Sequence, residues 1–526
     1  MKKEIILIGL LVLLCLPGLF HYSLWDDEAN TALTGKAILR SGTTSAQVDD
    51  RNFLLYRHGS ELQKLINNYL PPLPAYVVAI SFQCFGTSGW SARIPFLAFG
   101  LAGLVCLFLA LGRAWPETSL VTIYIILMTG NVSLALFLAN CRYYALAFGS
   151  TLGLVLIYIL PFKPWAKVSL LSFCGTVLAG SNYLNYAALL AVLVVQQMLR
   201  NEPRLKLNKG QWATLLISQG FVLLFLGIYY NPLSRQVVIP EEGSRLTEKL
   251  ILMWWNVRDF DSAQFGSLPI LVSAGVWSYF CHQRQIRSFL RQGLFVMAIY
   301  IFGITILSPQ PVSQTSFADI RYLVPLIPLA LFVEALFLAS LLIGKNKTLL
   351  VLAVLVSGTN LFQLQFFRTM EFRSFFLDRI GEIIRPPAEP YSETSSWISS
   401  HVAPGKSVWV VPDFMTYPLM FHAPQAVYAW QLRPEQKDEE QFKNLPDIHF
   451  QGLVPPDYIV AFGPSVVQIR QLVSQWSLQG MNYQEVTRLL IFWKDLYRPE
   501  LFWRTFKPIE NFDPNTEAIY IFKKQP

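Results

Sequence analysis

About eleven apolar segments in the first 366 residues constrain this chain more than any other feature. A membrane-spanning helix needs about 20 mostly apolar residues to cross a hydrocarbon core of roughly 30 Å, and these segments approach that length. Only 14% of the 526 residues are charged, whereas soluble proteins carry about 25%. The pattern predicts a polytopic α-helical membrane protein, with spans near residues 4–20, 92–112, 118–138, 143–160, 168–183, 184–199, 212–230, 267–281, 292–307, 322–343 and 348–366.

The distribution of basic residues predicts how these spans are oriented. If the N-terminus is cytoplasmic, each inside loop is basic and nearly free of acids, as the positive-inside rule requires. Residues 21–91 then form the first outside loop, and the odd number of spans places the segment after residue 366 outside as well. The basic residues expected on the inside are Lys2, Lys3, Arg113, Lys163, Lys167, Arg200, Arg204, Lys206, Lys209, Arg284, Arg287, Arg291, Lys345 and Lys347.

The segment after residue 366 is more polar and rich in proline. It alternates apolar runs typical of strands with helical patterns, which predicts a small α/β domain. We expect a transmembrane domain over residues 1–366, with interfacial helices in loop 21–91, and an extracytoplasmic α/β domain over residues 367–526. No Gly-rich phosphate loop is present there, so we assign that domain no cofactor. The expected strands are 407–411, 458–462 and 518–522, and the expected helices are 465–476 and 483–490.

Three consecutive acids, Asp26, Asp27 and Glu28, follow the first apolar segment. Carboxylates beside hydrocarbon are costly unless they are paired or hydrated, and for that reason they are usually functional. Acids are also favoured at a helix N-terminus, and residues 31–39 have helical spacing, so a charged helix cap is the structural alternative. A cap explains one acid well and three poorly, which favours a functional site.

Three arginines at outer membrane edges run against the topological bias, namely Arg93, Arg142 and Arg321. A guanidinium fork is suited to a phosphate or phosphodiester at the lipid surface. Snorkelling to lipid head groups is the alternative, and for Arg93 it is equally plausible. Arg321 follows Asp319 between two spans, which favours phosphate binding. His58 lies in the first outside loop and is a further candidate, although a lone histidine is more often structural.

A series of motifs follows the first apolar segment in a fixed order. They are Asp27-Glu28, Thr31 to Gly42, Pro71-Pro72-Leu73 with Tyr76, Phe85-Gly86, Trp90 to Pro95, Arg142-Tyr143, and Arg321-Tyr322 with Pro325 and Pro328. The order of these motifs resembles that in the GT-C superfamily of polytopic glycosyltransferases. It is most similar to the bacterial relatives of protein O-mannosyltransferases and of the aminoarabinose transferase that modifies lipid A. A Lys sometimes found before the Pro-Pro pair is absent here, and a second acidic motif near Arg142 is not evident.

The resemblance implies transfer of a sugar from a polyprenyl-phosphate donor to an extracytoplasmic acceptor hydroxyl. Asp27 would act as general base, with Asp26 or Glu28 orienting the base or the acceptor. Arg321 would stabilise the departing phosphate, with Arg142 and Arg93 as further candidates. The acids are also of a type that binds a divalent metal, which the sequence does not require. The expected substrate-binding residues are Tyr76, Tyr143, Tyr322 and His58.

Other functions fit the sequence less well. A transporter or flippase would be expected to show internal repeats and interrupted helices, and no repeat relates the two halves. A polymerase or ligase acting on lipid-linked glycans would place its main catalytic loop late in the chain. A scaffold leaves the acids and the outside arginines unexplained. We therefore expect an enzyme of a bacterial cytoplasmic membrane, whose partners are the lipid-linked donor, a lipid, glycan or protein acceptor and membrane lipids, and not nucleic acid.

Overall fold

The computed structural model contains two compact units, each built from segments that are distant in sequence. Unit 1 comprises Met1–Gly18, Phe96–Arg385 and Glu500–Thr505, and unit 2 comprises Leu19–Pro95, Pro386–Pro499 and Phe506–Pro526. The structure describes residues 2–20, 22–115, 119–199, 207–230, 246–264, 267–310, 312–313, 316–342, 348–357, 375–386, 388–478, 480–491, 493–494, 507–508, 513 and 518–526.

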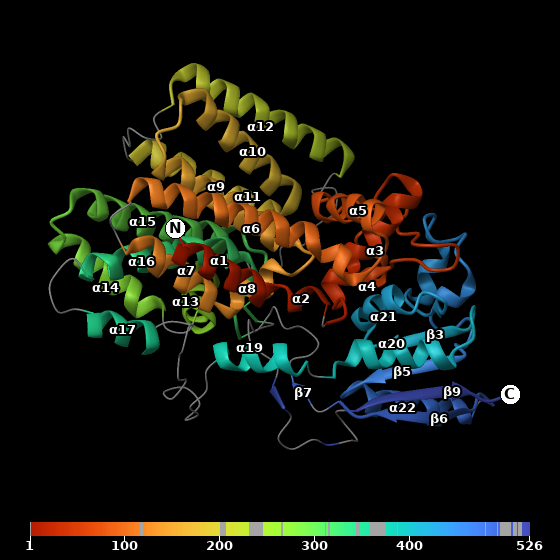
Figure 1. Cartoon of the computed structure of the whole chain (residues 1–526). Helices are drawn as coiled ribbons and strands as arrows, with labels where there is room; N and C mark the ends of the chain where they lie inside the picture. Colours follow the sequence, from red (N-terminus) through yellow and green to blue (C-terminus); the bar gives the residue numbers. More distant parts are fainter. Residues whose placement is uncertain are drawn as a thin grey trace. The chain divides into compact units, whose positions relative to one another are not determined.

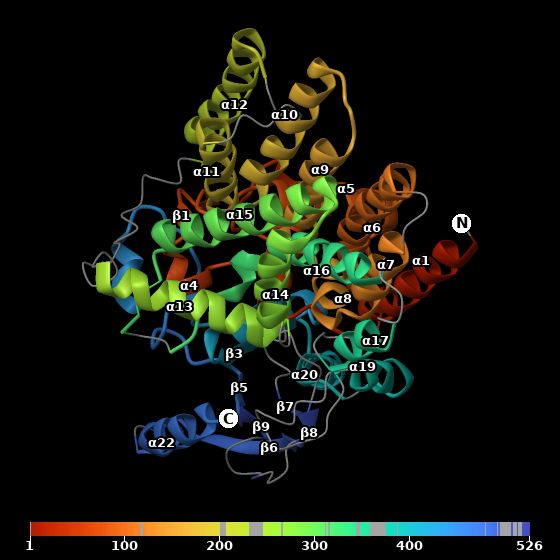
Figure 2. The same cartoon turned by 90° about the vertical axis from the view of Figure 1, so that its left-hand side faces the viewer.

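Unit 1 is a bundle of helices. Within it, α10 packs against α9 and α12, and α15 packs against α11, α14 and α16 (Figures 1 and 2). The helices that unit 1 draws from the first 230 residues are α1 (Lys2–Cys15), most of α6 (Gly89–Ala114), α7 (Leu120–Gly130), α8 (Val132–Leu138), α9 (Tyr143–Ile159), α10 (Pro164–Ser181), α11 (Tyr183–Leu199) and α12 (Lys209–Tyr229). The later helices are α13 (Leu246–Ala263), α14 (Ser267–Phe280), α15 (Arg284–Leu307), the 3-10 helix η2 (Ile320–Leu326), α16 (Ile327–Leu342), α17 (Thr348–Ser357) and α19 (Phe375–Ile384).

Every expected span coincides with one or more of these helices, although the part of the last span beyond residue 357 lies outside the described residues. Within the described chain, four helices are long and apolar enough to cross a membrane by length and composition. A fifth candidate is the pair α7 and α8, which is bent by 71°. The remaining apolar helices are shorter, so the expected number of eleven spans stays a prediction.

The first part of unit 2 is built on two packed helices, α3 (Asp26–Ser41) and α5 (Leu73–Phe85). Helix α3 begins at the acids themselves, five residues before the helical pattern recognised in the sequence. Close packing of the two helices depends on Gly35, because a Cβ there would lie 2.8 Å from Cγ1 of Val78. The other elements of this part are α2 (Pro17–Phe20), which runs into it from unit 1, α4 (Tyr56–Gly59), β1 (Leu62–Gln63) and β2 (Ile66–Asn67).

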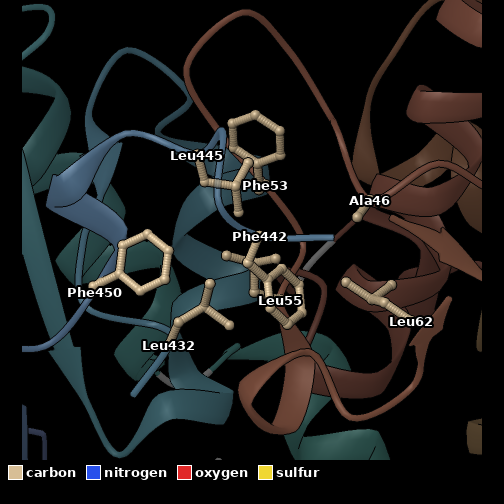
Figure 3. Packing of buried hydrophobic residues seen from close by; sticks show 8 residues of the cluster. All are labelled: Ala46, Phe53, Leu55, Leu62, Leu432, Phe442, Leu445 and Phe450. Carbon is tan, nitrogen blue, oxygen red and sulfur yellow. The ribbon is translucent and has the colours of Figure 1, made fainter. Parts of the chain in front are cut away.

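The first loop and the C-terminal segment share one hydrophobic core (Figure 3). Four of its buried residues come from the loop and four from a stretch almost 400 residues later, so neither segment completes this core alone. The expected division placed residues 21–91 with the membrane domain, whereas the contacts group them with the C-terminal segment. The core residues are Ala46, Phe53, Leu55, Leu62, Leu432, Phe442, Leu445 and Phe450.

The C-terminal segment contains a five-stranded mixed sheet in the order β4-β3-β5-β9-β6. Strands β3, β4 and β5 are parallel, and β9 is antiparallel to both β5 and β6. Helix α22 packs against β5. The elements are α20 (Pro390–His401), β3 (Ser407–Val411), η3 (Asp413–Met415), α21 (Thr416–His422), β4 (Val427–Tyr428), η4 (Pro434–Asp438), η5 (Asp447–His449), β5 (Tyr458–Phe462), α22 (Ser465–Ser477), β6 (Tyr483–Leu489) and β9 (Ile519–Lys524), with the separate pair β7 (Trp493–Lys494) and β8 (Lys507–Pro508).

The helix expected over residues 483–490 is wrong, because this segment is strand β6. Its side chains alternate between half-buried and exposed positions, which is the period-2 pattern of a strand. Val486 and Thr487 are β-branched and favour extended backbone. The strand pairs with β9 on both sides of an irregularity at Val486. The expected strands 407–411, 458–462 and 518–522 and the helix 465–476 are confirmed to within two residues.

Candidate active site

The three acids form the first turn of α3 and are buried. The exposed fractions are 1% for Asp26, 6% for Asp27 and 1% for Glu28. The N-cap residue is Trp25, whose side chain makes no capping hydrogen bond. The positive end of the helix dipole favours acids in this turn, but burying three carboxylates requires further partners.

Glu28 is bound by Arg93, which lies in the unit 2 part of α6. Nε of Arg93 donates to Oε1 of Glu28 at 2.8 Å, and Nη2 donates to Oε2. The same guanidinium donates to the backbone carbonyls of Tyr22 at 2.6 Å and Ser23 at 2.9 Å. Arg93 is 3% exposed, so the pair is a two-pronged ion pair inside unit 2. These contacts favour a structural role for both side chains.

Asp26 and Asp27 lie in the electrostatic neighbourhood of two tyrosines. The Asp27 amide donates to Oδ1 of Asp26 at 2.6 Å. Burial, with smaller contributions from the negative charges of Asp27 and Asp26, raises the pKa of Tyr56 to about 12. The ring of Tyr417 packs edge-on against that of Tyr56, with centroids 5.3 Å apart. Burial raises the pKa of Tyr417 as well, with Asp26 among the smaller causes. Both phenols are therefore neutral hydrogen-bonding groups beside the acids.

Arg57 adds a cation to this neighbourhood that the sequence patterns did not single out. Its guanidinium carbon lies 5.2 Å from the centroid of the Tyr56 ring, and its charge opposes that of the acids on Tyr56. The side chain is 62% exposed and lies 3.8 Å from the buried carboxylate of Glu61. Arg57 and His58 both have positive φ, 49° and 55°, which costs about 1–3 kcal/mol for non-glycine residues and is most common at functional sites.

The segment before the acids is held by side chains of the C-terminal segment. The Ser23 amide donates to Oε1 of Glu389, and the Leu24 amide donates to Nε2 of His422, each at 2.9 Å. Burial lowers the pKa of His422 to about 4, with a smaller contribution from Arg93. Burial raises the pKa of Glu389, partly offset by its bonds to Ser23. No sequence pattern links Ser23 and Leu24 to residues almost 400 positions later, so the sequence did not predict the contacts of Glu389 and His422.

Two of the expected substrate-binding residues in unit 2 lie in structural positions. Nδ1 of His58 lies 2.9 Å from the carbonyl oxygen of Gln431. The Tyr76 hydroxyl donates to the carbonyl of Gly42 at 3.4 Å. Gly42 follows the C-terminus of α3, about 24 Å from Asp26 at 1.5 Å per residue. The expected roles of His58 and Tyr76 remain predictions, and these positions do not favour them.

The other expected residues form a second cluster, in unit 1. Nε of Arg321 lies 2.8 Å from Oδ1 of Asp319, and its guanidinium carbon lies 5.7 Å from the centroid of the Tyr322 ring. The Tyr143 hydroxyl donates to the Arg321 carbonyl at 3.5 Å. Arg142 is the N-cap residue of α9, immediately before Tyr143. The structure thus brings together Tyr143, Arg321 and Tyr322, with Arg142 next to Tyr143 in the chain. The expected roles of these residues remain predictions.

The acid cluster does not have the arrangement of a metal site. Within the described ranges, no three His, Cys, Asp or Glu side chains converge as metal ligands would. Both oxygens of Glu28 bind Arg93, and a hard cation needs several oxygens that are not already committed to a cation. We therefore assign no step to a metal.

Comparison with known proteins identifies the fold. No family model matches the chain, and no curated protein matches it by sequence. Two solved structures of ArnT from Cupriavidus metallidurans match over 98% of this chain and 97% of theirs. The apo structure has a TM-score of 0.54 at 13% identity, and the structure bound to undecaprenyl phosphate has 0.55 at 12%. The chain therefore has the fold of ArnT, which confirms the expected resemblance at the level of the fold.

Proposed function

We propose that this protein transfers a sugar from a polyprenyl-phosphate donor to an acceptor hydroxyl at the extracytoplasmic surface of a bacterial cytoplasmic membrane. The observation that carries the proposal is the match, over 98% of the chain, to ArnT bound to undecaprenyl phosphate. The three buried acids at the start of α3 support it, because a helix cap requires one acid and burial of the other two is costly. The basic inside loops support the orientation.

Asp27 is the proposed general base. The acceptor hydroxyl attacks the anomeric carbon, and its proton passes to the Asp27 carboxylate as the new C–O bond forms. Asp27 is the most accessible of the three acids at 6% exposed. Glu28 is committed to Arg93, and Asp26 accepts the Asp27 amide. We therefore propose that Asp26 orients Asp27 and that Glu28 anchors the turn.

A guanidinium stabilises the departing lipid phosphate in the proposed reaction. The bond from the anomeric carbon to the phosphate oxygen breaks, and the electron pair leaves with that oxygen. A fixed cation that meets this growing charge lowers the barrier. Arg321 is the first candidate because Asp319 and the Tyr322 ring orient it, and Arg142 is the second. Arg93 is the least favoured of the three arginines, because its N–H groups already donate to Glu28 and to two backbone carbonyls.

Sugar transfer in isolated membranes tests the proposal. Membranes from cells carrying wild type, Asp27→Asn or Asp50→Asn receive a radiolabelled pool of polyprenyl-phosphate sugars. Loss of a general base lowers the rate by roughly 10²–10⁴-fold, so we expect Asp27→Asn to transfer almost no label at normal protein levels. Asp50, 89% exposed and paired with Arg40, is the matched control and should behave like wild type.

The outcomes separate the alternatives. Transfer by Asp27→Asn at the wild-type rate would remove Asp27 as the base and return the acids to a capping role. No transfer by wild type from any donor in the pool would contradict the proposed activity and favour the transporter alternative. A labelled product from wild type would identify the acceptor.

A further inference from the structure

We propose that His422 and Glu389 of the C-terminal segment are positioning residues that set the location of the acid turn. They act on Tyr22 to Leu24, three residues that end just before the N-cap residue Trp25 and that we call the strap. The inference rests on the proposed function only in that Asp27 is the group being positioned. All of these residues belong to unit 2.

The strap has no regular structure and depends on side chains for its hydrogen bonds. The amides of Ser23 and Leu24 donate to Glu389 and His422. The carbonyls of Tyr22 and Ser23 accept from Arg93. Leu24 is 0% exposed, so water does not compete for its amide, and a buried amide without an acceptor is costly. Four backbone groups in three residues are thus fixed from outside the strap.

The strap is close enough to the acids to control them. Leu24 and Asp27 are three residues apart, a span of at most about 11 Å. Trp25, between them, provides no side-chain cap of its own. The first turn of α3 is therefore set by the direction in which the strap enters it. A shift of about 1 Å in a catalytic group can cost roughly 100-fold in rate.

Helix α21 links the C-terminal segment to the acids at both of its ends. Near its start, Tyr417 packs on Tyr56, which is electrostatically coupled to Asp26 and Asp27. At its end, Nε2 of His422 accepts from Leu24. This contact requires a neutral ring with its proton on Nδ1, and burial favours the neutral ring. The residues near the two ends of this short helix therefore both act on the first turn of α3, one through Tyr56 and the other through Leu24.

Hydrogen exchange of the full-length protein in detergent tests the positioning directly. Removing an acceptor from a buried amide should cost about tenfold in protection. We expect His422→Leu to speed exchange of the amides of residues 24–28 about tenfold, and His422→Gln, which restores an acceptor, to recover most of the protection. His449→Leu is the matched control, because His449 is a buried histidine of unit 2 whose Nδ1 contacts the Tyr428 carbonyl and not the strap. It should leave these amides unchanged.

A second pair of variants keeps the test decisive if His422→Leu misfolds, which faster exchange in β5 would reveal. Glu389→Leu should speed exchange at Ser23, and Glu389→Gln should preserve it. Unchanged exchange at residues 23–28 in both leucine variants would overturn the proposal.

The transfer assay distinguishes positioning from a purely structural role, because loss of positioning lowers kcat without changing KM. In folded His422→Leu we expect kcat to fall at least tenfold, while KM for the radiolabelled donor stays within about twofold, with rescue by His422→Gln. Faster exchange with an unchanged kcat would also overturn positioning. If wild type transfers no sugar, the proposed function fails, whereas the exchange data still decide whether the C-terminal segment sets the acid turn.

Discussion

Glu28 and Arg93 form an ion pair in which neither partner is accessible to water, with side-chain exposures of 1% and 4%. Removing one partner of such a pair leaves a buried charge uncompensated and typically costs about 3–5 kcal/mol. We expect Glu28→Gln and Arg93→Gln each to lower the free energy of unfolding by that amount, measured by denaturant titration in detergent. The double variant should cost clearly less than the sum. Additive losses would show that the two side chains stabilise unit 2 independently.

His422 makes stability sensitive to acid. Its folded pKa of about 4 lies below the ordinary 6.5, so folding excludes the proton. Its contribution to the free energy of unfolding is complete above pH 6.5 and is lost as the pH falls through about 4. The free energy of unfolding changes by about 3 kcal/mol over this range. Burial raises the pKa of Glu389, so its contribution to stability is instead lost as the pH rises. We expect the stability difference between wild type and His422→Gln to shrink across this range in pH-dependent unfolding. A constant difference would contradict a protonation-coupled role.

At the scale of single residues, the sequence identified the acids but not their partners. A run of three carboxylates beside an apolar segment is a local and costly pattern, which makes it visible. Glu389 and His422 are ordinary residues in a polar segment, and only folding brings them to the strap. Arg57 went unnoticed for a different reason, since its positive φ is a property of the folded backbone.

At the scale of elements, hydropathy was a reliable guide and weak amphipathicity was not. Long apolar runs predicted the helices because the driving force for them is local in sequence. Strand β6 was mistaken for a helix because seven residues with mixed polarity fit both periods. Its pairing with β9 decided the outcome, and that partner lies 30 residues further along the chain.

Helix α3 depends on its close contact with α5. An added Cβ at Gly35 would lie 2.8 Å from Cγ1 of Val78 and 3.1 Å from the carbonyl oxygen of Ala75. We expect Gly35→Ala to destabilise unit 2 by about 1–3 kcal/mol through overpacking, measured as a shift in the unfolding transition. Gly381 in α19 has no atom within 4 Å of an added Cβ. Gly381→Ala is the control and should stabilise slightly, because alanine favours helix. Equal effects at both sites would contradict the contact.

At the scale of the whole molecule, the sequence predicted a membrane part and a C-terminal α/β part but not the composition of the units. The first loop was assigned by its position between two spans. Its apolar residues instead complete a core with residues 432–450 (Figure 3). Long-range pairing of this kind leaves no periodic signal in either segment.

The shared core makes the first loop dependent on the C-terminal segment. Phe442 is 0% exposed in that core, and Phe→Ala substitutions in cores cost about 3–5 kcal/mol. We expect Phe442→Ala to speed amide exchange in residues 44–67 as well as around the mutation. Val467→Ala, at a half-exposed position of α22, should affect neither. Exchange that changes only in the C-terminal segment would contradict a shared core.

The hydrogen-bond acceptors of the strap are synthesised long after the strap itself. Its two amides find their acceptors 366 and 398 residues later. At about 5–20 residues per second, the ribosome needs roughly 20–80 s to bridge that distance. During this time the first span and its acids have already been made, but the side chains that fix their entrance do not yet exist. A chain that stops early would reach the membrane without a finished acid turn, so translation to the C-terminal segment becomes a condition for a competent enzyme.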